Sequence, residues 1–142
     1  MRNTIIIVIA AALVVMVYRF FQPAADDRLA TGSVSATAMV DVTLAGDLSA
    51  DAVAGKRLFE ASCAACHGEN AAGQADVAPP LIHKIYEPSH HGDESFQRAV
   101  AMGVRAHHWR FGNMPAVEGL NRNDVAKIVT YVRELQRANG IN

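Results

Sequence analysis

The longest unbroken apolar stretch of the chain covers residues 5–18, close to its N-terminus. Arg2 precedes it, and an Arg-Phe-Phe sequence follows at residues 19–21. A signal-peptide core has about 7–15 apolar residues and a membrane-spanning helix about 20, so length alone leaves both open. Arginine and aromatic residues are typical of a membrane interface, and we therefore predict an uncleaved single-pass anchor over residues 1–21, with a cleaved signal peptide as the alternative. Both interpretations place the remaining chain on the periplasmic side.

The apolar pattern is lost after this segment. Residues 22–50 are rich in Ala, Thr, Ser, Asp and Gly and show no helical or strand period, which predicts a flexible linker. Within it, residues 39–44 are compatible with a short strand or with a segment that wraps on the following domain. Residues 51–142 regain helical periodicity, and we assign them to one folded domain.

Apolar residues spaced three or four apart predict the helices of this domain. The first helix carries Phe59, and Asp51 is a plausible N-cap for it. Another helix is opened by Asp93, and Met102 within it is interpreted as a core residue.

The last predicted helix has the clearest signals. Asn121 is a good N-cap, Asp124 at the third helical position can complete a capping box, and residues 139–140 (Asn-Gly) are a stop signal. Its apolar stripe indicates a buried face made of Val125, Ile128, Val129, Val132 and Leu135.

Charge changes this picture only slightly. The formal net charge is -1, and without Arg2 and Arg19 the remainder has 11 basic and 14 acidic residues, or about -3. The sequence contains no basic stripe, so we do not expect nucleic-acid binding.

The candidate chemistry lies in the sequence Cys63-Ala64-Ala65-Cys66-His67. Two cysteines are too few for a disulfide framework or a four-cysteine zinc site. Residues three apart share one face of a helical turn, so both sulfurs can add to the vinyl groups of one haem, with His67 next in line beneath the iron. Thiol–disulfide oxidoreductases also contain a C-x-x-C motif, but they need a βαβ context that these helical patterns do not indicate.

Residues 51–141 resemble a class I monohaem cytochrome c. The family pattern is a glycine-containing helix that ends in C-x-x-C-H, a Pro-x-Leu loop, a Met-Pro loop and a long C-terminal helix. All four occur here in that order. The resemblance implies an all-α fold of about four helices around one covalent haem c, and it does not extend to the N-terminal segment or the linker.

The resemblance also implies roles for individual residues. Cys63 and Cys66 would attach the haem, and His67 and Met114 would be the axial ligands of its iron. The carbonyl of Pro79 would accept a hydrogen bond from His67 and so fix its tautomer.

Further residues would support the haem and the fold. Leu81 would pack on the haem, and Gly55 and Phe59 match the positions where the first helix crosses the last one, near Tyr131. Trp109 and Phe111 would lie at the haem edge, and either Trp109 or Arg110 is a candidate donor to a haem propionate.

Histidine is the alternative to Met114 as sixth ligand. Met114 is favoured because it lies in a loop that Pro115 stiffens. The histidines other than His67 are His83, His90, His91, His107 and His108.

Two histidine pairs stand out, at residues 90–91 and 107–108. We interpret both as surface loops. The alternative is a second metal site, with copper as a metal that imidazole suits. Adjacent histidines on regular structure point apart, so such a site would take one histidine from each pair.

These patterns predict an electron carrier rather than an enzyme, with redox proteins of unknown identity and the membrane as partners and no small-molecule substrate. One alternative is a haem subunit of a larger respiratory or copper-handling complex. Another is an enzyme or gas sensor with an open sixth position on the iron, which Met114 argues against.

Overall fold

The computed structural model describes residues 37–142. The predicted anchor and the first part of the predicted linker therefore lie outside the described residues. The helices are α2 (Ala50–Ser62), α3 (Ala64–His67), α4 (Asp93–Met102) and α5 (Arg122–Ala138), with short 3-10 turns at Glu69–Ala71 and Lys84–Tyr86. Residues 37–142 contain two isolated β-bridges and no longer strand, so the all-α prediction is confirmed for this part of the chain. No helix among them has the length and apolar character to span a membrane.

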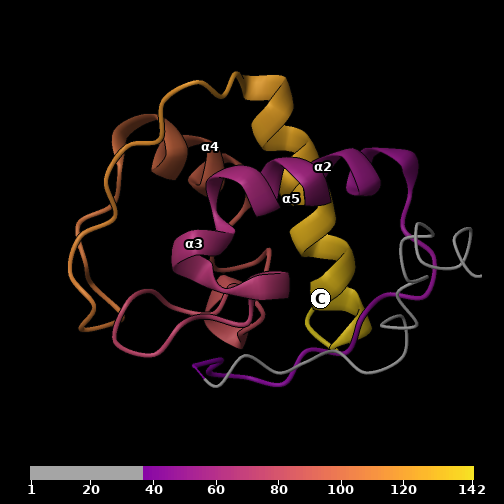
Figure 1. Ribbon diagram of the computed structural model, residues 1–142, viewed down its shortest axis with the longest axis horizontal. Coiled ribbons are helices and arrows are strands. Elements are labelled where there is room, and N and C mark those ends of the chain that lie inside the picture. The colour runs from indigo at the N-terminus through magenta and orange to yellow at the C-terminus, as the bar shows by residue number, and fades with distance from the viewer. Residues whose placement is uncertain (1–36) are drawn as a thin grey trace, which may run out of the picture. The chain divides into compact units, whose positions relative to one another are not determined.

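The centre of the domain is the crossing of α2 over α5, which Figure 1 shows near the middle of the view. Gly55 is buried at this crossing, and a Cβ atom on it would lie 1.9 Å from the Lys127 carbonyl oxygen. One turn further along α2, the ring of Phe59 packs on that of Tyr131 with centroids 5.7 Å apart. The crossing implied by the resemblance is therefore present, and the absence of a side chain on Gly55 allows it.

The buried face of α5 follows the predicted stripe. Each of its five apolar residues is at most 4% exposed. The helix begins with the predicted capping box, in which the Asn121 side chain accepts from Asp124 N and the Asp124 carboxylate accepts from Asn121 N. It ends at Ala138, before Gly140 at a φ of 74°. These sequence predictions are confirmed.

The start of α2 differs from the prediction, because Ser49 and not Asp51 is the N-cap. The Ser49 side chain accepts from Ala52 N, and its hydroxyl donates to Glu134 Oε1 of α5 at 2.7 Å. The contact with α5 holds Ser49 in the cap position, while Asp51 lies in the first turn, where its charge suits the helix dipole.

Residues before α2 already lie on the domain. Backbone bonds join Met39 N and Val40 N to Ala72 O, and the Thr43 backbone pairs with the Asn139 side chain in both directions. Of the two options for residues 39–44, the wrapping segment is the one observed.

Met102 is 71% exposed, so its interpretation as a core residue was wrong. Val100 is the buried residue of α4. Met102 follows it by two positions, which is about 200° around a helix, and therefore faces away from the core.

The close contact at Gly55 yields a stability prediction. Gly55→Ala should lower the free energy of unfolding by about 1–3 kcal/mol, because the added methyl overlaps the Lys127 carbonyl and forces two helices apart. Urea unfolding of the haem-loaded protein measures this. Gly46→Ala is the matched control, since a Cβ there meets nothing within 4 Å. Equal unfolding midpoints for the two variants would contradict the prediction.

Candidate functional site

The Cys-x-x-Cys-His motif forms a turn of its own at the end of α2. Cys63 leaves the helix at φ −122° and ψ −34°, and α3 follows it as a single turn. Cys66 N and His67 N both donate to the Cys63 carbonyl oxygen, at 3.1 and 2.9 Å. The prediction of one helix running into the motif therefore changes to two helical pieces, while both thiols remain one turn apart. Both are free, with Cys66 exposed and Cys63 partly buried.

The thiol of Cys63 is in the wrong environment for disulfide exchange. Burial, with a smaller effect from Cys66, raises the pKa of the Cys63 thiol to about 11. Thiol–disulfide oxidoreductases need a thiolate at neutral pH and lower this pKa instead. Together with the all-helical described region, this argues against the oxidoreductase alternative.

His67 is held in one tautomer. Its Nδ1 lies 2.9 Å from the Pro79 carbonyl oxygen, the contact that the resemblance implies. Because a carbonyl only accepts, Nδ1 carries the proton and Nε2 keeps its lone pair. Burial lowers the pKa of the imidazole, against a smaller opposing effect of this hydrogen bond, so the neutral, metal-binding form is favoured.

The chain around His67 is tightly packed. Gly73 N donates to His67 O at 2.7 Å, and Gly73 has a φ of 75° with Pro80 N only 2.5 Å from where a Cβ would be. Leu81 is buried in the same core cluster as Phe59 and Tyr131. The Pro-Pro-Leu segment is thus fixed between the motif and the α2–α5 core.

Met114 is positioned by its backbone. Val104 N donates to Met114 O at 2.9 Å, and Met114 N donates to Val104 O at 3.0 Å. This bridge closes a loop over residues 105–113, and Asn113 Oδ1 accepts from Ala106 N inside it. Gly103, at a φ of 73°, allows the backbone of Met114 to come close, because a Cβ at this position would lie only 2.5 Å from Met114 O.

The tip of this loop packs on the segment that follows Pro79. The Trp109 ring meets that of His83 edge-on, with centroids 5.2 Å apart, and stacks on Phe111 at 5.8 Å. Trp109 Nε1 is buried and has no hydrogen-bond partner among the described residues. Burial raises the pKa of the Tyr86 hydroxyl, and the nearby Trp109 indole N–H opposes this rise, although the two groups do not meet hydrogen-bond geometry.

Comparison with known proteins decides the family. The family model described as cytochrome c matches residues 52–136. The chain belongs to the cytochrome c family. It is similar to cytochrome c6 of Picosynechococcus sp. (strain ATCC 27264 / PCC 7002 / PR-6), with 36% identity over 90 residues, 61% of this chain and 74% of that protein.

Two further relatives are much longer. The Cbb3-type cytochrome c oxidase subunit FixP of Bradyrhizobium sp. (strain ORS 278) is 38% identical over 87 residues, which are 60% of this chain. FixPc of Rhizobium leguminosarum bv. viciae is 36% identical over 86 residues, 59% of this chain. The match spans only 28% of the length of each of these relatives.

Membership of the family confirms covalent haem c as the cofactor and the electron-transfer class of the domain. The residues present fit that group. Two free thiols one turn apart precede an imidazole with an available Nε2, and the buried indole N–H of Trp109 has no partner within residues 37–142. A buried unpaired donor is costly, and a haem propionate is an acceptor that would satisfy Trp109.

The histidine pairs lie in turns and bends at the surface, as predicted, but the two pairs also come together. The rings of His90, His91, His107 and His108 gather in one cluster of this cytochrome domain, with neighbouring centroids 4.2 to 6.1 Å apart. The side chain of His108 is exposed, but partial desolvation lowers its pKa, and the charges of His107, His91 and His90 lower that pKa further. His83 lies apart from the cluster, against Trp109.

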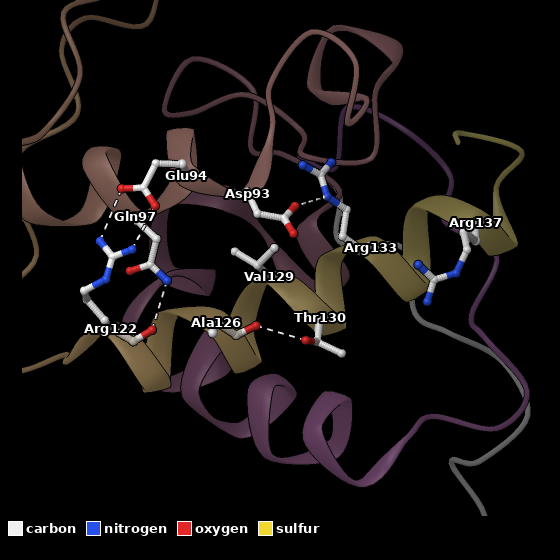
Figure 2. Close-up of a pocket in the computed structure, with 9 residues that line it drawn as sticks. All are labelled: Asp93, Glu94, Gln97, Arg122, Ala126, Val129, Thr130, Arg133 and Arg137. Carbon is white, nitrogen blue, oxygen red and sulfur yellow. Dashed lines mark hydrogen bonds and ion pairs between the residues drawn. The ribbon is translucent and has the colours of Figure 1, made fainter.

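A polar groove between α4 and α5 is a separate feature (Figure 2). Its charged groups are all paired. Arg122 donates to Glu94 through Nη1 and Nη2, at 3.2 and 2.8 Å, and Arg133 Nε donates to Asp93 Oδ1 at 2.9 Å. Arg137 Nη2 lies 3.9 Å from Glu134 Oε1. None of the residues assigned to the haem lines it.

Sequence reasoning missed the role of Arg133, which is only 7% exposed. Its guanidinium donates to Tyr86 O at 2.7 Å and to His91 O at 2.5 Å. An arginine within the apolar stripe of a helix was the available signal, since a buried arginine needs several partners.

The unpaired indole N–H yields a prediction. In the haem-loaded protein, Trp109→Phe should lower the free energy of unfolding by about 1–3 kcal/mol more than Phe111→Leu, because only the first removes a hydrogen-bond donor. Urea unfolding followed by haem absorbance measures the difference. A Trp109→Phe protein at least as stable as Phe111→Leu would show that Trp109 donates to nothing in the assembled site.

Proposed function

We propose that this chain is a membrane-tethered electron carrier with a single haem c on the periplasmic side. The observation that carries the proposal is the His67–Pro79 hydrogen bond directly after two free thiols, because it presents a neutral imidazole with a fixed free nitrogen. The anchor over residues 1–21 and a linker before the domain are part of the proposal and rest on the apolar and polar patterns of the sequence.

Each site residue has one task in this proposal. Cys63 and Cys66 attach the haem, His67 and Met114 ligate the iron, and Pro79 orients His67. When bound, haem c supplies an Fe(II)/Fe(III) couple. With His67 and Met114 both retained as ligands, the chain would change little between oxidation states and would give a substrate no access to the iron.

Met114 is proposed as the sixth ligand because its backbone is fixed on both sides by the bridge to Val104. The ferric protein should show the weak near-red absorption band of methionine–iron ligation. Rapid binding of carbon monoxide by the ferrous protein, together with absence of the band, would instead indicate an open-site enzyme or sensor. Denaturing mass spectrometry with one added haem mass tests the covalent attachment separately.

Gly103 provides a sharper test of this ligand. Gly103→Ala should weaken or abolish the near-red band, because the added Cβ would lie 2.5 Å from Met114 O and must displace that residue. Gly119→Ala is the matched control, since Gly119 also has a positive φ, of 84°, but a Cβ there meets nothing within 4 Å. If both variants keep the band of the unmodified protein, Met114 is not held to the iron in the proposed way.

A second candidate function is that of a haem subunit fixed in a larger respiratory or copper-handling complex. Two relatives are named as subunits of a Cbb3-type cytochrome c oxidase, and the match to each spans 28% of its length. A domain of this type therefore occurs both in longer oxidase subunits and in the shorter cytochrome c6.

Purification of the full chain from detergent-solubilised membranes separates the two candidates. A free carrier should elute without stoichiometric partners and be reduced by added quinol-linked donors in membranes. Constant co-elution with the same integral membrane subunits would support the complex. Recovery of the chain in the soluble periplasmic fraction would contradict the tether.

A further inference from the structure

The histidine cluster contains three ligand nitrogens in position for one metal ion. One nitrogen from each of His90, His91 and His108 lies within 4.8 Å of the others. Around a transition metal with metal–nitrogen distances of about 2.0–2.1 Å, ligand nitrogens lie roughly 3.3 Å apart in a tetrahedral arrangement. His90 and His108 are exposed side chains, so small rotations close this difference.

Both members of the first histidine pair take part, which differs from the expectation of one ligand from each pair. The reason is local: His90 N and His91 N both donate to the Glu87 carbonyl, at 3.1 and 2.8 Å. The two residues therefore lie in a tight turn rather than on regular structure, and their rings converge with centroids 4.7 Å apart.

His91 has the outer-shell contact expected of a metal ligand. Its Nδ1 lies 2.6 Å from the Ile85 carbonyl oxygen. The carbonyl can only accept, so Nδ1 is protonated and Nε2 is left with a free lone pair. A hydrogen bond from the ring nitrogen that does not bind the metal is the usual way in which proteins fix the orientation of an imidazole ligand.

The backbone beneath His91 is also held from the core. Arg133 Nη2 donates to His91 O and Arg133 Nη1 to Tyr86 O, so a buried side chain of α5 fixes both ends of the turn. The Tyr86 ring packs on the His91 ring at 5.1 Å. His90 and His91 therefore lie in a turn that Arg133 holds by hydrogen bonds, and His108 lies in the loop that the Val104–Met114 bridge closes.

We propose that His90, His91 and His108 bind one divalent transition-metal ion, with Cu(II) as the preferred ion. Three neutral imidazoles without a carboxylate or thiolate suit copper and zinc rather than magnesium or calcium, and Cu(II) binds such nitrogen sites most tightly among the first-row divalent ions. The fourth position is open to water or to a donor from a partner protein.

Binding at this site would join two separate segments. His90 and His91 belong to the turn after Pro79, and His108 lies on the loop that the Val104–Met114 bridge closes. A metal ion bound by both segments would cross-link them and restrict the loop over residues 105–113, which contains Trp109 and leads to Met114. This restriction of the loop follows from metal binding alone and does not require the ion to exchange electrons.

The test uses the full, haem-loaded protein and CuSO4 as the probe. After equilibration and exhaustive dialysis against metal-free buffer, about one copper per haem should remain. His90→Ala, His91→Ala and His108→Ala should each retain less than a tenth of that. The matched control His83→Asn removes an imidazole outside the cluster but keeps a side-chain acceptor for Ile85 N, and it should retain the copper fully. Electron paramagnetic resonance of the bound Cu(II) should show splitting from nitrogen ligands.

A structural readout accompanies the binding measurement. Copper should raise the urea midpoint of the unmodified protein and of His83→Asn, and leave that of His108→Ala unchanged. Two outcomes would overturn the proposal: no copper retained by the unmodified protein, or the same retention by all three cluster variants as by the unmodified protein, which would place the ion elsewhere on the chain. Neither outcome bears on haem attachment or on the near-red band, so the electron-carrier proposal is tested separately.

Discussion

The close approach of α2 and α5 at Gly55 is the contact on which the rest of the structure depends. With no side chain at Gly55, the two backbones come near enough for Phe59 and Tyr131 to pack one turn further on. That crossing fixes the direction of α2 and hence the place where the helix ends. The Cys63–His67 turn follows directly, so the position of the haem-attachment motif is set by a contact two turns away.

The loops that surround the motif have little regular structure, and α5 supplies the polar groups that hold them. Gln136 Nε2 donates to Leu81 O and Tyr86 O, at 2.9 and 3.0 Å, and Arg133 bonds Tyr86 O and His91 O. Buried carbonyls need such partners, because an unpaired one costs free energy. The same helix thus gives the core its apolar stripe and gives the loops their anchors.

Fold class, family and chemistry could be read from the sequence because each depends on local spacing. The capping box at Asn121 and the apolar stripe of α5 are set by neighbours within one or two turns, and the structure contains both. The spacing of Cys63, Cys66 and His67 likewise needs only one helical turn to carry its meaning. Even the contact of His67 with Pro79 was implied by the family pattern, since the order of motifs fixes it.

What the sequence left open required partners distant along the chain. Ser49 rather than Asp51 caps α2 because Glu134 reaches it from α5. Arg133 is buried because three segments bring acceptors to it. The two histidine pairs were predicted as surface loops, and only the fold showed that they lie in one cluster. Spacing along the chain determines helices and motifs, whereas contacts between residues far apart arise only when packing brings their backbones together.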